Sequence, residues 1–374
     1  MRIAFFTETF LPATDGVVTR LRYTLEELAR LGDEMLVVAP RYPDGGPDSY
    51  AGTPIYRVPG VPFPPYPRIK VSSAHPGVGR ALRRFGPDLI HAVNPIILGP
   101  SGIFYARRLK VPLVASYHTN VAVYARYYNL TLLANAARWW TRQLHNRAEI
   151  NLCTSEATMS YLLKEGVKRV HLWPQGVDAR RFHPEKASEE WRERLSGGHP
   201  SEKILLYVGR LAPEKGIERL KALLREVAGT RLAIVGDGPA RRDLEREFAG
   251  TPTVFTGVLQ GEDLAAAYAS ADAFLFPSTT DTLGLAMIEA LASGLPIVAA
   301  RSGASHEVVS EGKNGLLYEA NSAPSLVAAV RRLFSDAGFR EDLARGARAA
   351  AEERDWGSSS RALRGYYEQA LGGR

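Results

Sequence analysis

Residues 204–216 read ILLYVGRLAPEKG, the pattern of a buried parallel strand that ends in a basic loop. Gly209 lets the backbone of this loop approach a ligand closely, and Arg210 and Lys215 follow it. Open α/β sheets bind ligands at the carboxyl ends of their strands, and a guanidinium beside an ammonium suits a diphosphate. The stretch therefore indicates either an anion site or, as the alternative, a solvated basic turn.

A second stretch, residues 276–290, reads FPSTTDTLGLAMIEA and favours the anion site. It predicts a strand end, a loop and then a helix from about residue 283, whose first amides can meet an anion. Asp281 precedes this helix and Glu289 lies within it, about two helical turns further on. Carboxylates suit sugar hydroxyls, so the two stretches together predict a pocket for a nucleotide-sugar. In the alternative, Asp281 only caps the helix and Glu289 is a paired carboxylate of the core.

The two stretches resemble the donor half of the retaining glycosyltransferases of family 4, with their Gly-Arg loop, following lysine and Glu-x7-Glu motif. Here Asp281 takes the place of the first glutamate. The resemblance extends from Thr7 to Trp356 and includes the segment GVD-x3-F-x-P at residues 176–184. Residues 116–119, 255–261 and 282–285 look most like the lipid glycosyltransferases of the sulfoquinovosyl diacylglycerol synthase type.

Apolar runs alternate with helical patterns along the whole chain, which predicts an α/β protein. Taken with the resemblance, this implies the GT-B architecture, two doubly wound Rossmann-like domains facing across a cleft. We expect an acceptor-binding domain over residues 1–185 and a nucleotide-sugar-binding domain over 186–355. Residues 356–374 are expected to form a helix that crosses back to the first domain.

The resemblance also implies roles for single residues. Gly16 and Val17, in a loop with no GxGxxG pattern, would lie against the donor diphosphate, and His118 would face the donor sugar. His91 has no such support. Glu289 would hold the ribose and Asp281 the sugar. Separately from the resemblance, the loop at residues 257–261, which contains Leu259, is a candidate for contacting the base. The expected catalytic residues are His118, Arg210, Lys215 and Asp281. The expected donor-binding residues are Gly16, Val17, Arg210, Lys215, Leu259, Asp281, Thr282, Leu283, Gly284, Leu285 and Glu289.

The charge of the chain is uneven. Of 374 residues with a net charge of +7, residues 51–150 hold 13 Lys and Arg but only two acids, Asp88 and Glu149. Such a surface attracts anionic lipid or nucleic acid, or is simply a basic solubilising surface. The one cysteine, Cys153, excludes an internal disulfide, and no apolar run is long enough to span a bilayer. We therefore expect a cytoplasmic protein bound peripherally to the inner face of the cell membrane.

Residues 121–147 interleave aromatic side chains with arginines. This composition suits a membrane interface, and it equally suits a core helix with a solvated rim. No nucleic-acid module accompanies it, so we expect no nucleic-acid partner. Tyr124, Arg126 and Tyr128 are the candidate acceptor-binding residues.

These features predict a metal-independent transferase. Arg210, Lys215 and the amides near residue 284 would stabilise the leaving diphosphate, a role that a metal plays elsewhere. There is no DxD-type acid pair and no evident covalent nucleophile, so we expect no cofactor and, by the resemblance, front-face displacement. We expect a UDP-hexose donor and a diacylglycerol-type or glycolipid acceptor. The alternatives are a GDP-mannose-dependent mannosyltransferase, a nucleotide-sugar epimerase or hydrolase, and a non-catalytic basic binding protein. The oligomeric state stays open.

Overall fold

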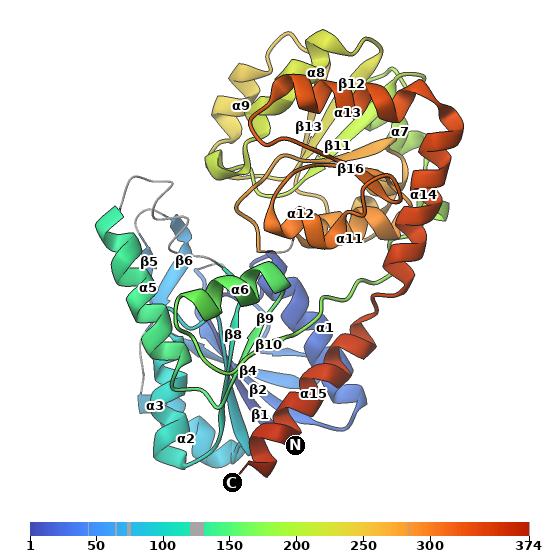
Figure 1. Ribbon diagram of the computed structural model, residues 1–374. Helices are drawn as coiled ribbons and strands as arrows, with labels where there is room; N and C mark the ends of the chain where they lie inside the picture. Colours follow the sequence, from blue (N-terminus) through green and yellow to red (C-terminus); the bar gives the residue numbers. More distant parts are fainter. Residues whose placement is uncertain (44, 64–65, 73–75, 120–130, 283, 374) are drawn as a thin grey trace. The chain divides into compact units, whose positions relative to one another are not determined.

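The structure is a computed structural model that describes residues 1–43, 45–63, 66–72, 76–119, 131–282 and 284–373. The chain divides into two compact α/β units (Figure 1). The first comprises Met1–Gly176 and Trp356–Arg374, and the second Val177–Asp355. This division precedes the expected boundary at residue 185, because Val177 already pairs with Asp355 and Phe182 is buried in the core of the second unit.

Eight strands form the main sheet of the first unit. They are β1 (Arg2–Thr7), β2 (Glu34–Pro40), β3 (Ser49–Tyr50), β4 (Thr53–Val58), β7 (Leu89–Val93), β8 (Leu113–Tyr117), β9 (Ile150–Cys153) and β10 (Val170–Leu172). Their order is β10-β9-β8-β7-β1-β2-β4-β3, with all neighbours parallel except β3 and β4. The long apolar runs read as strands are thereby confirmed, since a parallel sheet covered on both faces needs apolar side chains on both.

The helices of the first unit are α1 (Gly16–Arg30), α2 (Pro76–Phe85), α3 (Gly99–Leu109), α5 (Thr131–His145), α6 (Glu156–Lys164) and α15 (Trp356–Gly372). The last of these, α15, packs beside α1 and buries Leu363 and Tyr367 in the core (Figure 1). Its first residue, Trp356, stacks on Tyr23 with ring centroids 4.9 Å apart. Gly176 is needed here, because a Cβ at this position would lie 2.7 Å from the Trp356 backbone.

The second unit is a doubly wound sheet of six parallel strands. They are β11 (Lys203–Val208), β12 (Thr230–Val235), β13 (Thr253–Gly257), β14 (Ala273–Phe276), β15 (Ile297–Ala300) and β16 (Gly315–Tyr318). Their order is β13-β12-β11-β14-β15-β16. Chain order reverses between β11 and β14, which is where doubly wound sheets bind their ligands.

Helices cover both faces of this second sheet, so its core forms two layers. They are α7 (Glu189–Ser196), α8 (Lys221–Glu226), α9 (Arg241–Glu247), α10 (Gly261–Ala269), α11 (Leu285–Ala292), α12 (Gly303–Val308), α13 (Ala323–Ser335) and α14 (Ala337–Glu352). Short 3-10 turns add η1 (Pro184–Lys186), η2 (Pro213–Lys215) and η3 (Ile217–Leu220).

Two segments differ from what their sequence patterns predict. The spacing of apolar residues over 217–227 predicts one helix, but the segment forms η3 followed by the short α8. The density of proline around residues 60–67 predicts a loop, but the region contains a separate antiparallel pair, β5 (Gly60–Phe63) and β6 (Tyr66–Ser72). A two-stranded ribbon tolerates proline because both of its outer edges are unpaired.

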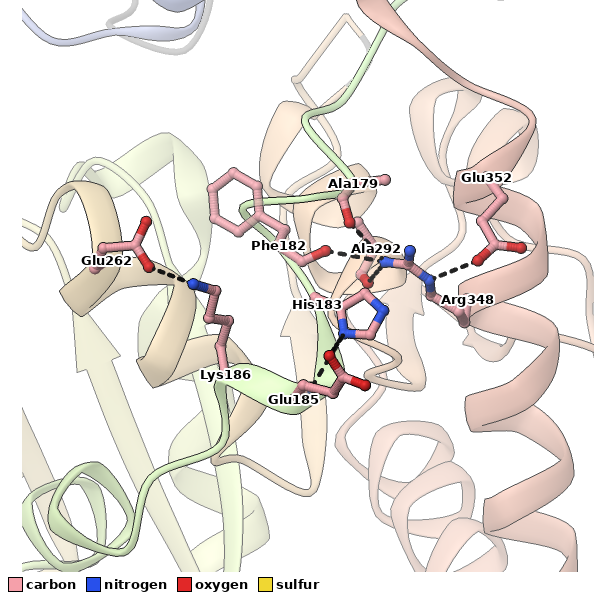
Figure 2. A network of polar contacts seen from close by, with 9 residues as sticks. All are labelled: Ala179, Phe182, His183, Glu185, Lys186, Glu262, Ala292, Arg348 and Glu352. Atoms are coloured by element: carbon pink, nitrogen blue, oxygen red, sulfur yellow. Dashed lines mark hydrogen bonds and ion pairs between the residues drawn. The ribbon is translucent and has the colours of Figure 1, made fainter.

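Arg348 on α14 ties three segments of the second unit together (Figure 2). Its Nη1 atom lies within 3.0 Å of the carbonyl oxygens of Ala179, Phe182 and Ala292, and its Nε donates to Glu352. Ala292 ends α11, the helix that carries Glu289. Arg348 therefore fixes the segment that enters the second unit against the end of this helix.

We expect Arg348→Ala to lower the free energy of unfolding by about 2–3 kcal/mol, because it leaves partly buried carbonyl groups without their charged donor. Arg345→Ala is the matched control on the same helix, since Arg345 is 72% exposed and its ion pair among the described residues is with Asp342. Its change should stay within about 0.5 kcal/mol. Urea denaturation measures both, and equal effects of the two substitutions would contradict the role of Arg348.

Candidate active site

Lys215 and Asp281 meet at the point where the strand order of the second unit reverses. Lys215 ends η2 in the loop after β11, and Asp281 lies in the loop after β14. The Lys215 Nζ atom is 2.5 Å from Asp281 Oδ1, and both side chains are at most 20% exposed. The sequence expectation that these loops converge is thus confirmed for this pair.

The ion pair determines the charge of Asp281. Burial by itself would raise the pKa of this carboxyl, but the charge and hydrogen bond of Lys215, with smaller effects of Ser278 and Arg210, bring the pKa below its usual value. The second oxygen, Oδ2, is buried and accepts no hydrogen bond of good geometry from the described residues. The site therefore holds an ionised carboxylate.

Glycines let the loops after β11 and β12 lie in backbone contact. A Cβ on Gly236, whose φ is +137°, would lie 1.9 Å from the Gly209 carbonyl oxygen. A Cβ on Gly238 would lie 2.2 Å from the Leu211 carbonyl oxygen. This oxygen accepts a hydrogen bond from the Ala240 N–H at 2.9 Å. These contacts hold the Gly209–Leu211 backbone in place, and with it the start of the loop that leads to Lys215.

Arg210 is placed differently from Lys215. Its side chain is 40% exposed and forms an ion pair with the fully buried Glu214, a partner that the sequence interpretation missed. The i,i+4 spacing of the two residues was the available signal. Arg210 reaches the site as a guanidinium already oriented by a buried carboxylate.

The helix α11 begins at Leu285, two residues later than expected. Gly284 stands at its N-cap position with φ +84°, and no side chain of the described residues caps the helix. A Cβ here would lie 2.9 Å from both the Met287 side chain and the Phe276 ring, so the position requires glycine. The alternative in which Asp281 caps this helix is wrong, and the first turn can offer its amides to an anion.

Glu289 lies on the second turn of α11. One carboxylate oxygen accepts a hydrogen bond from the Tyr268 hydroxyl at 3.0 Å. Burial raises the pKa of Glu289 to about 7, although Tyr268 and Arg181 oppose the shift. Among the described residues Glu289 forms no ion pair, and its hydrogen-bond partner is the Tyr268 hydroxyl, so its role in donor binding stays a prediction. Tyr268, from α10, was not anticipated.

Two other expected donor residues of the second unit, Leu259 and Thr282, lie in the loops that follow β13 and β14. Leu259, in the loop between β13 and α10, is half-buried, and its neighbour Val258 is 52% exposed. Thr282 is partly buried. Leu283 lies outside the described residues, as do the candidate acceptor residues Tyr124, Arg126 and Tyr128.

In the first unit, backbone N–H groups of the expected donor-binding loop already donate hydrogen bonds to a side chain of the same loop. Asp15 caps α1 and accepts the backbone N–H groups of Val17 and Val18 at 2.8 and 2.9 Å, while Gly16 is exposed. A diphosphate at Val17 would therefore have to share this amide with a carboxylate. Glu8, another residue not anticipated, accepts backbone N–H groups from each of residues 96–99 at the start of α3.

His118 follows β8 and is held from two sides. Its backbone N–H donates to Asn94 Oδ1 at 3.2 Å, and its Nε2 lies 2.8 Å from Ser116 Oγ. Burial, and then the charge of Arg20, lower its pKa well below the usual value, so the ring is neutral. His91 lies fully buried on β7.

Trp139 and Trp140 of α5 are 55% and 41% exposed, so the core-helix interpretation does not hold for them. No helix in the described part of the chain has the length and apolar character needed to span a membrane. The described residues contain no cluster of His, Cys, Asp and Glu suited to a metal ion.

Comparison with known proteins fits this geometry. The model of Glycosyltransferase Family 4 matches residues 14–181, and that of Glycosyl transferases group 1 matches residues 202–336. The chain is 37% identical to the sulfoquinovosyl transferase SQD2 of Arabidopsis thaliana, over 97% of this chain and 72% of that one. It is 39% identical to a GDP-mannose-dependent alpha-mannosyltransferase of Mycobacterium tuberculosis, over 100% of this chain and 98% of that one. It is 30% identical to an alpha-monoglucosyldiacylglycerol synthase of Streptococcus pneumoniae, over 85% and 75%.

Among solved structures, the sucrose-phosphate synthase of Thermosynechococcus elongatus superposes with a TM-score of 0.83 at 21% identity, over 100% of both chains. The two doubly wound units have the GT-B fold, and the two matching family models show that the chain is a glycosyltransferase. More closely, the chain belongs to glycosyltransferase family 4.

Proposed function

We propose that the protein transfers a hexosyl group, with retention, from a UDP-sugar to a diacylglycerol-type or glycolipid acceptor. The observation that carries the proposal is the division of the donor site in the second unit. Lys215 and the uncapped first turn of α11 supply positive potential for a diphosphate, whereas Asp281 and Glu289 supply acceptors for hydroxyls. The named activities of the plant sulfoquinovosyl transferase and the streptococcal monoglucosyldiacylglycerol synthase support a lipid product.

In this proposal no metal is required, because Lys215, Arg210 and the α11 amides stabilise the charge on the leaving diphosphate. The bond between the sugar C1 and the phosphate oxygen breaks as the acceptor oxygen bonds to the same face of C1. The acceptor proton passes to the departing phosphate oxygen, so no covalent intermediate forms. Glu289 holds the ribose, and Asp281 and His118 orient the sugar.

A second candidate is transfer of mannose from GDP-mannose. The similarity to the mycobacterial alpha-mannosyltransferase, which extends over 98% of that chain, favours it. It uses the same phosphate and ribose contacts and differs in the base and the sugar.

The test combines donor binding with transfer. Melting temperatures are measured with UDP, GDP and their hexoses, since a bound donor raises stability by mass action. Transfer is then followed with the stabilising donor and diacylglycerol liposomes. We expect a rise with UDP-hexoses and a labelled glycolipid. A rise with GDP-mannose alone supports the second candidate, transfer only to soluble acceptors rejects the lipid acceptor, and donor turnover without any acceptor indicates a hydrolase or epimerase.

We also propose that α5 contacts an anionic membrane surface. Trp139 and Trp140 present exposed rings with centroids 6.3 Å apart, and the Trp140 indole N–H donates to the Ile96 carbonyl oxygen. Arg142 and Arg138, which pairs with Glu165, lie on the same helix. Aromatic rings settle at headgroup depth and arginines meet lipid phosphate, so this helix suits a lipid substrate.

Trp139→Ala with Trp140→Ala should weaken binding to vesicles containing anionic phospholipid at least about tenfold, because both interfacial anchors are lost. Leu31→Ala removes an exposed apolar side chain elsewhere on the first unit and is the matched control. Vesicle co-sedimentation measures both variants. Equal binding of the double variant and the control would contradict membrane contact through α5.

A further inference from the structure

Four side chains of the first unit form a continuous hydrogen-bonded chain that reaches His118. The Tyr367 hydroxyl of α15 lies 2.6 Å from His91 Nδ1, and His91 Nε2 lies 2.8 Å from Ser116 Oγ. The same Ser116 oxygen lies 2.8 Å from His118 Nε2. Tyr367, His91 and Ser116 have no exposed surface, so bulk solvent does not reach their polar atoms.

The number of available protons determines which group donates and which accepts in each of these hydrogen bonds. The Tyr367 hydroxyl has His91 Nδ1 as its only hydrogen-bond partner among the described residues, and a buried O–H without an acceptor is costly. Tyr367 must therefore donate, which makes His91 Nδ1 the acceptor and places the His91 proton on Nε2. That proton goes to Ser116 Oγ, and the Ser116 hydroxyl then donates to His118 Nε2. In the reverse direction, Tyr367 would accept from His91 and its own proton would have no acceptor.

The argument requires both imidazoles to be neutral, because a charged ring donates from both nitrogens. Burial, and then the charge of Arg20, lower the pKa of His91 to about 3. The same two causes lower the pKa of His118 well below its usual value, with further effects of His91 and His145. Arg20 is itself buried against Trp173, with its guanidinium carbon 3.6 Å from the ring centroid.

We infer that Tyr367, His91 and Ser116 are positioning residues that hold His118 as the neutral tautomer with its proton on Nδ1. The inference rests on the proposed function only in that His118 orients the donor sugar. His118 then meets the sugar with its ring fixed through Nε2 and with a single protonation state. The C-terminal helix α15 thereby contributes to the active site through Tyr367, which does not touch the substrate.

The test compares Tyr367→Phe with Tyr366→Phe. Tyr366 is the adjacent residue of α15, and its hydroxyl donates to the Leu172 carbonyl oxygen at 2.9 Å, outside this chain of contacts. Each substitution removes one hydroxyl and one hydrogen bond from the same helix. Only Tyr367→Phe removes the donor that sets the direction of the proton chain.

Nitrogen-15 NMR of the histidine side chains reads the tautomers without any substrate. In the wild-type protein we expect His118 protonated at Nδ1 and His91 at Nε2, with mixed tautomers in Tyr367→Phe and no change in Tyr366→Phe. The value of kcat for transfer should fall about tenfold in Tyr367→Phe, with the KM for the donor nearly unchanged. Folding of each variant is followed by thermal melting.

His118 protonated at Nε2 in the wild-type protein, or two variants with the same spectra and the same kcat, overturns the inference. An altered tautomer in Tyr367→Phe with unchanged kcat also overturns it, because His118 would then not depend on its ring state for the reaction. Absence of transfer in the wild-type protein contradicts the proposed function instead, and the NMR result distinguishes the two failures.

Discussion

Lys215→Ala is expected to reduce kcat/KM for transfer by about 10²–10³-fold, the largest effect of any single substitution in the site. Lys215 is at most slightly exposed and lies at the strand reversal, where its ammonium is desolvated. A cation in such a position stabilises negative charge far better than one in water. Because the charge grows as the diphosphate leaves, most of the loss should fall on kcat rather than on KM.

The substitution also leaves Asp281 as a buried carboxylate without its partner. Part of the effect could then be loss of stability, so Lys215→Ala is paired with the double variant Lys215→Ala/Asp281→Asn, which removes both charges. If the account is right, the double variant regains stability but not activity. Lys221→Ala is the control for a lysine. Lys221 lies away from the strand ends and its Nζ atom is 2.9 Å from Glu247 Oε1, so this variant should retain full activity. Activity of Lys215→Ala within threefold of the control would reject the role of Lys215.

Glu289→Gln is expected to reduce kcat/KM by about 10²-fold or more. An ionised carboxylate can accept from two ribose hydroxyls at once, and an amide replaces one of these acceptors with a donor. With a pKa of about 7, Glu289 is only partly ionised at neutral pH. The kcat/KM of the wild-type protein should therefore rise with pH through about 7, and this step should vanish in Glu289→Gln.

The free energy of unfolding should fall as the pH rises through about 7, whereas kcat/KM should increase. The pKa of Glu289 is raised in the folded protein, from 4.5 to about 7, so the folded state binds more protons between these values. The contribution of Glu289 to the free energy of unfolding is complete below about pH 4.5 and is lost as the pH rises through about 7. Relative to Glu289→Gln, the wild-type protein should lose about 1–3 kcal/mol of unfolding free energy between pH 5 and pH 8.

Glu247→Gln is the matched control for both measurements, because Glu247 lies at the surface of the same unit and pairs with Lys221. It should keep full activity and the wild-type step in the pH profile. An unchanged pH profile in Glu289→Gln would show that another group titrates near pH 7.

The fold was predictable because covered parallel strands leave long apolar runs in the sequence, as in β11. The convergence of Lys215 and Asp281, 66 residues apart, followed from one rule, that the carboxyl ends of parallel strands meet at one edge. The ion pair between Arg210 and Glu214 was not expected, although the i,i+4 spacing of the two residues is visible in the sequence.

Other features depend on tertiary packing that a single sequence does not reveal. Tyr268 reaches Glu289 only because α10 packs against α11. Likewise, Tyr367 reaches His91 across 276 residues, because α15 returns to the first unit. The sequence interpretation did not include Arg348, which secures the end of α11.

The central claim is that Lys215, Asp281 and Glu289 hold a single nucleotide-sugar. A crystal structure with UDP, or with GDP if that nucleotide raises the melting temperature, tests it most directly. We predict the diphosphate within hydrogen-bond distance of Lys215 Nζ and the first amides of α11, with both ribose hydroxyls at the Glu289 carboxylate. A nucleotide bound without contact to both Lys215 and Glu289 would contradict the account.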